Sequence, residues 1–219
     1  MRPAPERSAD RDAALAQALP HVPVHGWGWR ALQAALCEAG HGAESARLEA
    51  ELLFPGGAID MVETFIDLAD RDLARLAAAP GFADLRTTAR VTALVLGRLA
   101  ALAPHREAVS RSLGVLALPR HARVATGSLA RTVDEIWHQA GDASADFSWY
   151  TKRAILAGVY VPTLLFWLRD DSADGAATAA FLDRRLADVG RIGKLRGRIE
   201  ARLGAGLGAL RERMQPSAP

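Results

Sequence analysis

The amino-acid sequence predicts an all-α fold, a bundle of nine or ten helices. Apolar residues recur at spacings of three and four along most of the chain, the period of a helix with one buried face. The breaks between these periodic segments carry Gly, Pro or a residue that favours a helix N-terminus. Hydrophobic residues make up 50% of the 219 residues and charged residues 24%, proportions that allow one substantial core.

Three short helices are expected first, over Ala9–Ala18, Trp29–Ala39 and Glu44–Leu53. Pro20 cannot continue the first helix, and the following sequence HVPVHGWG is interpreted as a connector. Gly40 suits the left-handed position that follows many helix C-termini, and FPGG ends the third helix.

Longer helices follow, and Pro or Gly separates most of them. Asp146 and Asp174 are expected N-caps, because an aspartate side chain accepts hydrogen bonds from the free amides of a first helical turn. The longer helices are expected over Ala58–Ala79, Asp84–Leu102, His105–Leu116, His121–Gln139, the aromatic segment after Asp146, and Gly175–Val189.

This order of helices predicts three parts: a helix-turn-helix-like head (residues 1–55), a helical body (56–190) and a final amphipathic helix with its tail (191–219). A head of short helices before a larger helical body is similar to bacterial TetR-type repressors. A ligand-responsive transcription regulator is therefore one hypothesis.

The third short helix, ESARLEAELL, opposes that hypothesis. Its three glutamates face a single basic residue, Arg47, so its net charge is −2. A helix in the major groove needs cations toward the phosphates and polar donors toward the base edges. We therefore expect no binding to nucleic acid.

The composition favours a cytoplasmic protein. Formal net charge is only +2, and the single cysteine, Cys37, cannot form an intramolecular disulfide. The N-terminus lacks the apolar stretch of a secretory signal. The longest apolar run, Ala154–Leu168, contains Pro162 and is shorter than the roughly 18 to 20 residues that span a bilayer.

Catalytic motifs such as G-x-S-x-G, the P-loop or Cys-x-x-Cys are missing from the sequence. Two Glu-x-x-His pairs, Glu38/His41 and Glu135/His138, have the spacing that di-iron carboxylate bundles use. Gly40 interrupts the first pair, and we expect no further buried carboxylates on the apolar helix faces. The prediction is a protein that is not an enzyme and needs no metal and no cofactor.

The C-terminal stretch RIGKLRGRIEARLGAGLGALRERM has one apolar stripe among many cations. Seven Arg and Lys residues against two Glu residues give it a net charge of +5. This pattern is typical of a helix in a membrane interface, where each cation near anionic headgroups contributes about 1 kcal/mol. A last helix packed on the bundle is the alternative. The expected membrane-binding residues are Leu195, Arg196, Arg198, Ile199, Arg202, Leu203, Leu207 and Leu210.

The aromatic segment ADFSWYTKRAILAGVYVPTLLFWLRDDS resembles one known family, that of the coenzyme Q biosynthesis accessory protein conventionally numbered nine, a TetR-like lipid-binding protein. GWGWRALQAA and FPGGAIDMVETF support the resemblance, and the three pieces keep the family's order along most of the chain. The residues that carry it are Asp146, Trp149, Tyr150, Thr151, Arg153, Ala154, Leu156, Tyr160, Thr163, Asp170, Asp171 and Ser172.

The resemblance implies a non-catalytic protein that binds an isoprenoid lipid or ubiquinone precursor in an apolar tunnel. It also implies attachment to the inner membrane through the final helix, a homodimer, and presentation of the lipid to the pathway's di-iron hydroxylase. It implies Trp149 and Tyr150 as partner-binding residues, with packing onto the core at the helix start as the alternative. Arg153, a cation beside them, is expected in the same partner-binding surface. The tunnel residues expected from size and place are Trp137, Val159, Leu164, Phe166 and Trp167, with ordinary core packing as the alternative for each.

Overall fold

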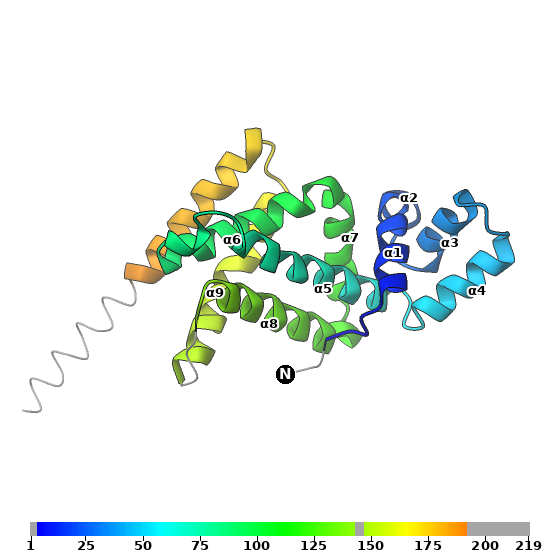
Figure 1. Ribbon diagram of the computed structural model, residues 1–219, viewed down its shortest axis with the longest axis horizontal. Coiled ribbons are helices and arrows are strands. Elements are labelled where there is room, and N and C mark those ends of the chain that lie inside the picture. The colour runs from blue at the N-terminus through cyan, green and yellow to red at the C-terminus, as the bar shows by residue number, and fades with distance from the viewer. Residues whose placement is uncertain (1–3, 143–146, 192–219) are drawn as a thin grey trace, which may run out of the picture.

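The computed structural model describes residues 4–142 and 147–191 of the chain. These ranges are predominantly helical and contain no strand, so the predicted all-α class is confirmed (Figure 1). Helices α1 to α4 gather at one end of the molecule, and longer helices form the rest (Figure 1).

The N-terminal group consists of α1 (Ala9–Ala18), α2 (Val22–His25), α3 (Trp29–Glu38) and α4 (Ala43–Leu53). The prediction of a connector at HVPVHGWG is wrong for its first part, where a 3₁₀ turn and α2 follow each other directly. Each of these short helices has a proline in its first turn, where the missing amide would have no helical partner in any case.

The turn between α3 and α4 follows the prediction for Gly40. This glycine has a φ of 96°, and the amide of His41 donates to the Leu36 carbonyl at 3.0 Å. A residue with a Cβ is strained in this left-handed conformation, which explains a glycine at this place.

Buried charge joins the N-terminal helices to the body. Arg11 of α1 donates to the Leu53 carbonyl at 2.9 Å, to Asp60 Oδ1 at 2.5 Å and to Thr64 Oγ1 at 3.0 Å. Its guanidinium lies 4.6 Å from the centre of the Phe54 ring. One side chain thus connects α1, the end of α4 and the start of the next helix.

The body is built around α5 (Ala58–Ala77), which packs against α6 (Thr87–Leu102) and α8 (Ala122–Gln139). The short α7 (Arg106–Leu116) closes one side, and α9 (Phe147–Trp167) packs on α8. A last described helix, residues 176–191, follows a 3₁₀ turn. Fully buried side chains from the body include Leu73, Leu94, Ile136, Leu156 and Leu182.

One predicted helix start and one predicted N-cap are wrong. α6 begins at Thr87 because residues 82–84 form a separate 3₁₀ turn that buries Phe82. Asp174 does not cap the last described helix. Instead Ser172 Oγ accepts from the Ala177 amide at 3.0 Å, and Asp170 Oδ2 accepts from the Thr178 amide at 2.8 Å. The other expected cap, Asp146, lies outside the described residues.

Candidate functional site

An apolar cavity of about 300 Å³, here called the inner cavity, lies among α5, α6, α7, α8 and α9. Its volume is at the lower end of the roughly 300–1,000 Å³ of small-molecule sites. The helix faces around it follow the three-and-four spacing of core faces, but several positions hold small side chains. These small lining residues are Ala69, Ser112, Ala117, Ala125 and Ser128.

The inner cavity reaches the surface beside α9. Val161 and Leu165 line it and are 36% and 49% exposed. Ala117, after the end of α7, also lines it and is exposed. The opening is therefore apolar, so an apolar ligand would not have to cross a charged rim.

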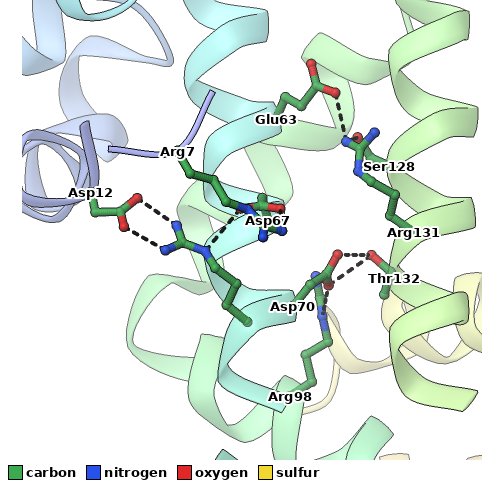
Figure 2. A network of polar contacts seen from close by, with 10 residues as sticks. Arg7, Asp12, Glu63, Asp67, Asp70, Arg98, Ser128, Arg131 and Thr132 are labelled. Atoms are coloured by element: carbon green, nitrogen blue, oxygen red, sulfur yellow. Dashed lines mark hydrogen bonds and ion pairs between the residues drawn. The ribbon is translucent and has the colours of Figure 1, made fainter. Parts of the chain in front are cut away.

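A buried polar cluster forms one part of the cavity wall. Asp70 of α5 lies between Arg98 of α6 and Thr132 of α8 (Figure 2). Arg98 Nε and Nη2 lie 3.0 and 2.8 Å from Asp70 Oδ1, and the Thr132 hydroxyl donates to the carboxylate at 2.9 Å. Arg98 Nη1 donates to the Tyr160 hydroxyl oxygen at 2.5 Å. Arg98, Thr132 and Tyr160 all line the cavity.

Burial sets the electrostatics of this cluster. It raises the pKa of Asp70, while Arg98 and Thr132 oppose that rise. It also raises the pKa of Tyr160, so this phenol stays neutral at physiological pH. Burial works against the charge of Arg98, but Tyr160 and Asp70 outweigh it, and the pKa of Arg98 is raised.

The cavity wall offers hydrogen-bond donors to a ligand. A guanidinium has no acceptor, so the Tyr160 oxygen must accept from Arg98 and the phenol keeps its own O–H. Ser128 likewise accepts from Arg131 Nη2 at 3.0 Å and keeps its hydroxyl proton. Among the residues that the structure describes, neither hydroxyl donates to an acceptor, so both suit a ligand with oxygen acceptors.

Three buried carboxylates run along α5, at Glu63, Asp67 and Asp70. The expectation that no carboxylates are buried on the helix faces is therefore wrong. Each one pairs with an arginine from elsewhere in the chain, and sequence spacing cannot show such partners. The pairs are Glu63–Arg131 at 2.7 Å, Asp67–Arg7 at 2.7 Å and Asp70–Arg98 at 2.8 Å (Figure 2).

These carboxylates do not form a metal site in the described part of the chain, where no group of three or more His, Cys, Asp or Glu side chains could hold a metal ion. Members of the two Glu-x-x-His pairs have other partners, and Glu38 lies 3.5 Å from His21 Nε2. Glu135 accepts from Gln139 Nε2 at 2.7 Å, and His41 lies 3.1 Å from Glu49.

The structure places one of the five expected tunnel residues at the inner cavity and the other four elsewhere. Leu164 lines the inner cavity. Trp137, Val159, Phe166 and Trp167 are not among its lining residues and pack between helices instead: Phe166 stacks on Phe181 at 4.6 Å, and Trp167 lies under the Arg106 guanidinium at 4.7 Å.

The expected partner-binding residues lie together at the start of α9. The Arg153 guanidinium is 3.9 Å from the centre of the Trp149 ring, and the Tyr150 ring meets Trp149 edge-on at 4.7 Å. Arg153 is buried and held by Asp134 at 2.5 Å. Tyr150 is 69% exposed, so the cluster presents a fixed aromatic surface.

This cluster lines part of a second apolar space of about 290 Å³, here called the outer hollow. Its walls come from α8 and α9. The residues that line it are Thr126, Leu129, Ala130, Val133, Trp149, Tyr150, Arg153, Ala154 and Ala157.

The predicted membrane-binding residues, Leu195 to Leu210, lie outside the described residues. Within the described ranges, no helix is long and apolar enough to cross a membrane. The acidic α4 is described, and its surface carries Leu48 and Leu52, which are 56% and 82% exposed.

The polar cluster of the inner cavity was missed from sequence. One signal was present: Arg98 falls on the apolar stripe of its predicted helix, with Val91, Leu94, Val95 and Leu102. A charge on such a stripe requires a buried partner, because an unpaired buried charge is costly. The sequence does not identify Asp70 or Thr132 as that partner, because they are 28 and 34 residues away from Arg98 along the chain.

Comparison with known proteins adds to this geometry. The COQ9 family model matches residues 122–193. The mitochondrial ubiquinone biosynthesis protein COQ9 of Rattus norvegicus is 34% identical over 188 residues, which is 82% of this chain and 58% of the rat protein. The Homo sapiens protein of the same name is also 34% identical, with 82% and 57% covered. The Schizosaccharomyces pombe protein is 31% identical over 183 residues, which is 83% of this chain and 70% of that protein.

The chain thus spans less than two thirds of the rat and human relatives. Among solved structures, a TetR transcriptional regulator from Nitrosomonas europaea ATCC 19718 has a TM-score of 0.65 and 23% identity, with 82% of this chain and 97% of that chain covered. This likeness shows a TetR-like fold alone. The matches along the chain show that it belongs to the COQ9 family of ubiquinone biosynthesis proteins.

Proposed function

We propose that this protein binds an isoprenoid lipid, a ubiquinone precursor, in the inner cavity and presents it to the di-iron hydroxylase of the pathway, without catalysis of its own. The observation that carries the proposal is an apolar cavity with an apolar opening and a donor-bearing wall in the middle of a helical body.

The energetics favour a prenyl chain as the occupant. Each buried CH₂ contributes about 0.8 kcal/mol relative to water. A bilayer supplies the same stabilisation, so the protein competes for the lipid only if its site is comparably apolar. Six of the eight residues of α7 and α9 that line the inner cavity are aliphatic, which meets this condition.

The polar cluster suits the oxygenated ring of such a lipid. Quinone carbonyl and ring ether oxygens are acceptors, while the Tyr160 and Ser128 hydroxyls supply donors. A purely hydrocarbon ligand would leave these donors buried and unsatisfied, at a cost of about 1–3 kcal/mol for each group.

We assign the contact with the hydroxylase, through which the lipid is presented, to Trp149, Tyr150 and Arg153. Large aromatics beside an arginine are typical of the residues that dominate protein interfaces. The Arg153 guanidinium packs 3.9 Å from the centre of the Trp149 ring, and the exposed Tyr150 needs no rearrangement to meet a partner.

We further propose that the protein is cytoplasmic and peripheral on the inner membrane, held there by the apolar stripe between Leu195 and Leu210 and the cations around it, and that it forms a homodimer. The repressor alternative is weaker, because α4 offers two exposed leucines and a net negative charge where a DNA-reading helix needs cations.

Extraction of bound lipid tests the proposal. Protein purified from a quinone-producing host should carry a prenylated ring compound, detected by mass spectrometry. Ala69→Phe places a large side chain in the inner cavity and should abolish this signal, whereas Ala74→Phe, on the exposed side of the same helix, should keep it. Wild-type protein without any bound lipid would refute the proposal.

A further inference from the structure

The inner cavity is too small to enclose a long prenyl chain. Its volume of about 300 Å³ lies at the lower limit of sites for small molecules. A chain of several isoprene units that fills it must continue beyond it. The part that leaves either enters water, at a cost that grows with every exposed carbon, or follows another apolar surface.

The outer hollow offers such a surface directly beside the inner cavity. Leu129 of α8 lines both spaces, and no other described residue does so. On α8, Ser128 and Thr132 line the inner cavity, while Ala130 and Val133 line the outer hollow. The two spaces therefore meet at Leu129, whose side chain is only partly buried.

α9 places the two spaces one after the other along its length. Its residues 149–157 supply the wall of the outer hollow, and residues 160–165 supply the wall of the inner cavity. Side chains three and four residues apart lie on one helix face, so the two walls adjoin. One chain can contact both in succession.

We propose that the outer hollow is a second subsite for the prenyl chain, that it continues the inner cavity past Leu129, and that it selects for lipids with more than a few isoprene units. This inference rests on the proposed lipid binding and names the chain-length class of the ligand.

The walls of the outer hollow fit an alkenyl chain. Leu129, Ala130, Val133, Ala154 and Ala157 provide aliphatic contact. Trp149 also lines the hollow, and the Arg153 guanidinium lies 3.9 Å from the centre of its ring. Arg153 is itself held by Asp134 at 2.5 Å and Asp142 at 3.4 Å, so the Trp149 ring rests on a fixed side chain.

The test compares short and long prenyl alcohols as probes. Geraniol, with two isoprene units, should need only the inner cavity, and geranylgeraniol, with four, should occupy both spaces. Native mass spectrometry of the full chain measures the two affinities. Wild-type protein should bind geranylgeraniol at least about tenfold more tightly than geraniol, because the added carbons are buried.

Ala154→Phe fills the outer hollow and should bring this ratio close to one by weakening geranylgeraniol alone. Leu129→Trp should do the same by blocking the passage. Ile155→Phe is the matched control, because Ile155 is a neighbouring exposed residue of α9 that lines neither space. Thermal unfolding of each variant identifies any that fails to fold.

Two results overturn the inference while lipid binding stands: a ratio in Ala154→Phe that equals that of Ile155→Phe, or an equal loss of both alcohols in folded Ala154→Phe and Leu129→Trp. Failure of wild-type protein to bind either alcohol would instead overturn the proposed function, and the second subsite with it.

Discussion

Replacing Arg98 by Met should leave Asp70 as a buried carboxyl without a counter-charge, and the resulting loss of stability should depend strongly on pH. Arg98 supplies two nitrogens within 3.0 Å of Asp70 Oδ1, and both residues are buried. After the substitution, Thr132 is the one donor to this carboxylate among the residues that the structure describes. Removing one partner of a buried ion pair costs about 3–5 kcal/mol.

Protonation of Asp70 limits this cost. Neutralising a carboxyl of ordinary pKa about 3.9 requires about 4 kcal/mol at pH 7 but only about 1.5 kcal/mol at pH 5. In the variant the folded-state pKa of Asp70 is raised above its unfolded value. The folded state therefore binds more protons than the unfolded state, and its stability increases as the pH falls.

Urea unfolding followed by far-ultraviolet circular dichroism measures the effect. The reference is the double variant Asp70→Asn/Arg98→Met, which differs from the single variant only in the carboxyl group. The single variant should be the less stable by up to about 4 kcal/mol at pH 7 and about 1.5 kcal/mol at pH 5. Equal differences at the two pH values would refute the reasoning, because the cost would then not arise from the charge of Asp70.

Three further predictions concern the surface and two aspartates with a lowered pKa, Asp12 and Asp170. Replacing Trp149 and Tyr150 by Ala should leave the fold intact but weaken association with the hydroxylase in a pull-down, whereas Ile155→Ala should not; unchanged association would remove this site assignment. Charge reversal of Arg196, Arg198 and Arg202 should reduce sedimentation with anionic vesicles, and the same reversal at the exposed Arg75, Arg111 and Arg123 should have little effect. Hydrogen bonds from Arg71 to Asp12, and from Ser172 and Thr178 to Asp170, lower the pKa of each aspartate. In acid the unfolded state therefore binds more protons than the folded state, and the melting temperature should fall as the pH drops below about 4. The fall should be less steep in Asp170→Asn, and an equally steep fall in that variant would contradict the role of Asp170.

Helix positions followed from local rules. The period of apolar residues and the Pro and Gly breaks placed the long helices, and Gly40 was identified as a helix end, because these features depend on residues only a few positions apart. The errors in predicting helix ends also arose from residues only a few positions apart. At Asp174 a competing pair, Asp170 and Ser172, takes the capping bonds.

The sequence by itself determined the all-α class, the family and the aromatic cluster of Trp149 and Tyr150. The class follows from the spacing of apolar residues, and the family and the cluster follow from the resemblance of short segments to known relatives. Only the tertiary structure decided that the inner cavity lies beside Leu164 and away from Phe166 and Trp167. It also decided that Asp70, Arg98, Thr132 and Tyr160, from four helices, share one buried cluster. The reason is physical: a cavity is volume that side chains from several helices fail to fill, and a buried charge is stable only beside a partner that is distant in sequence.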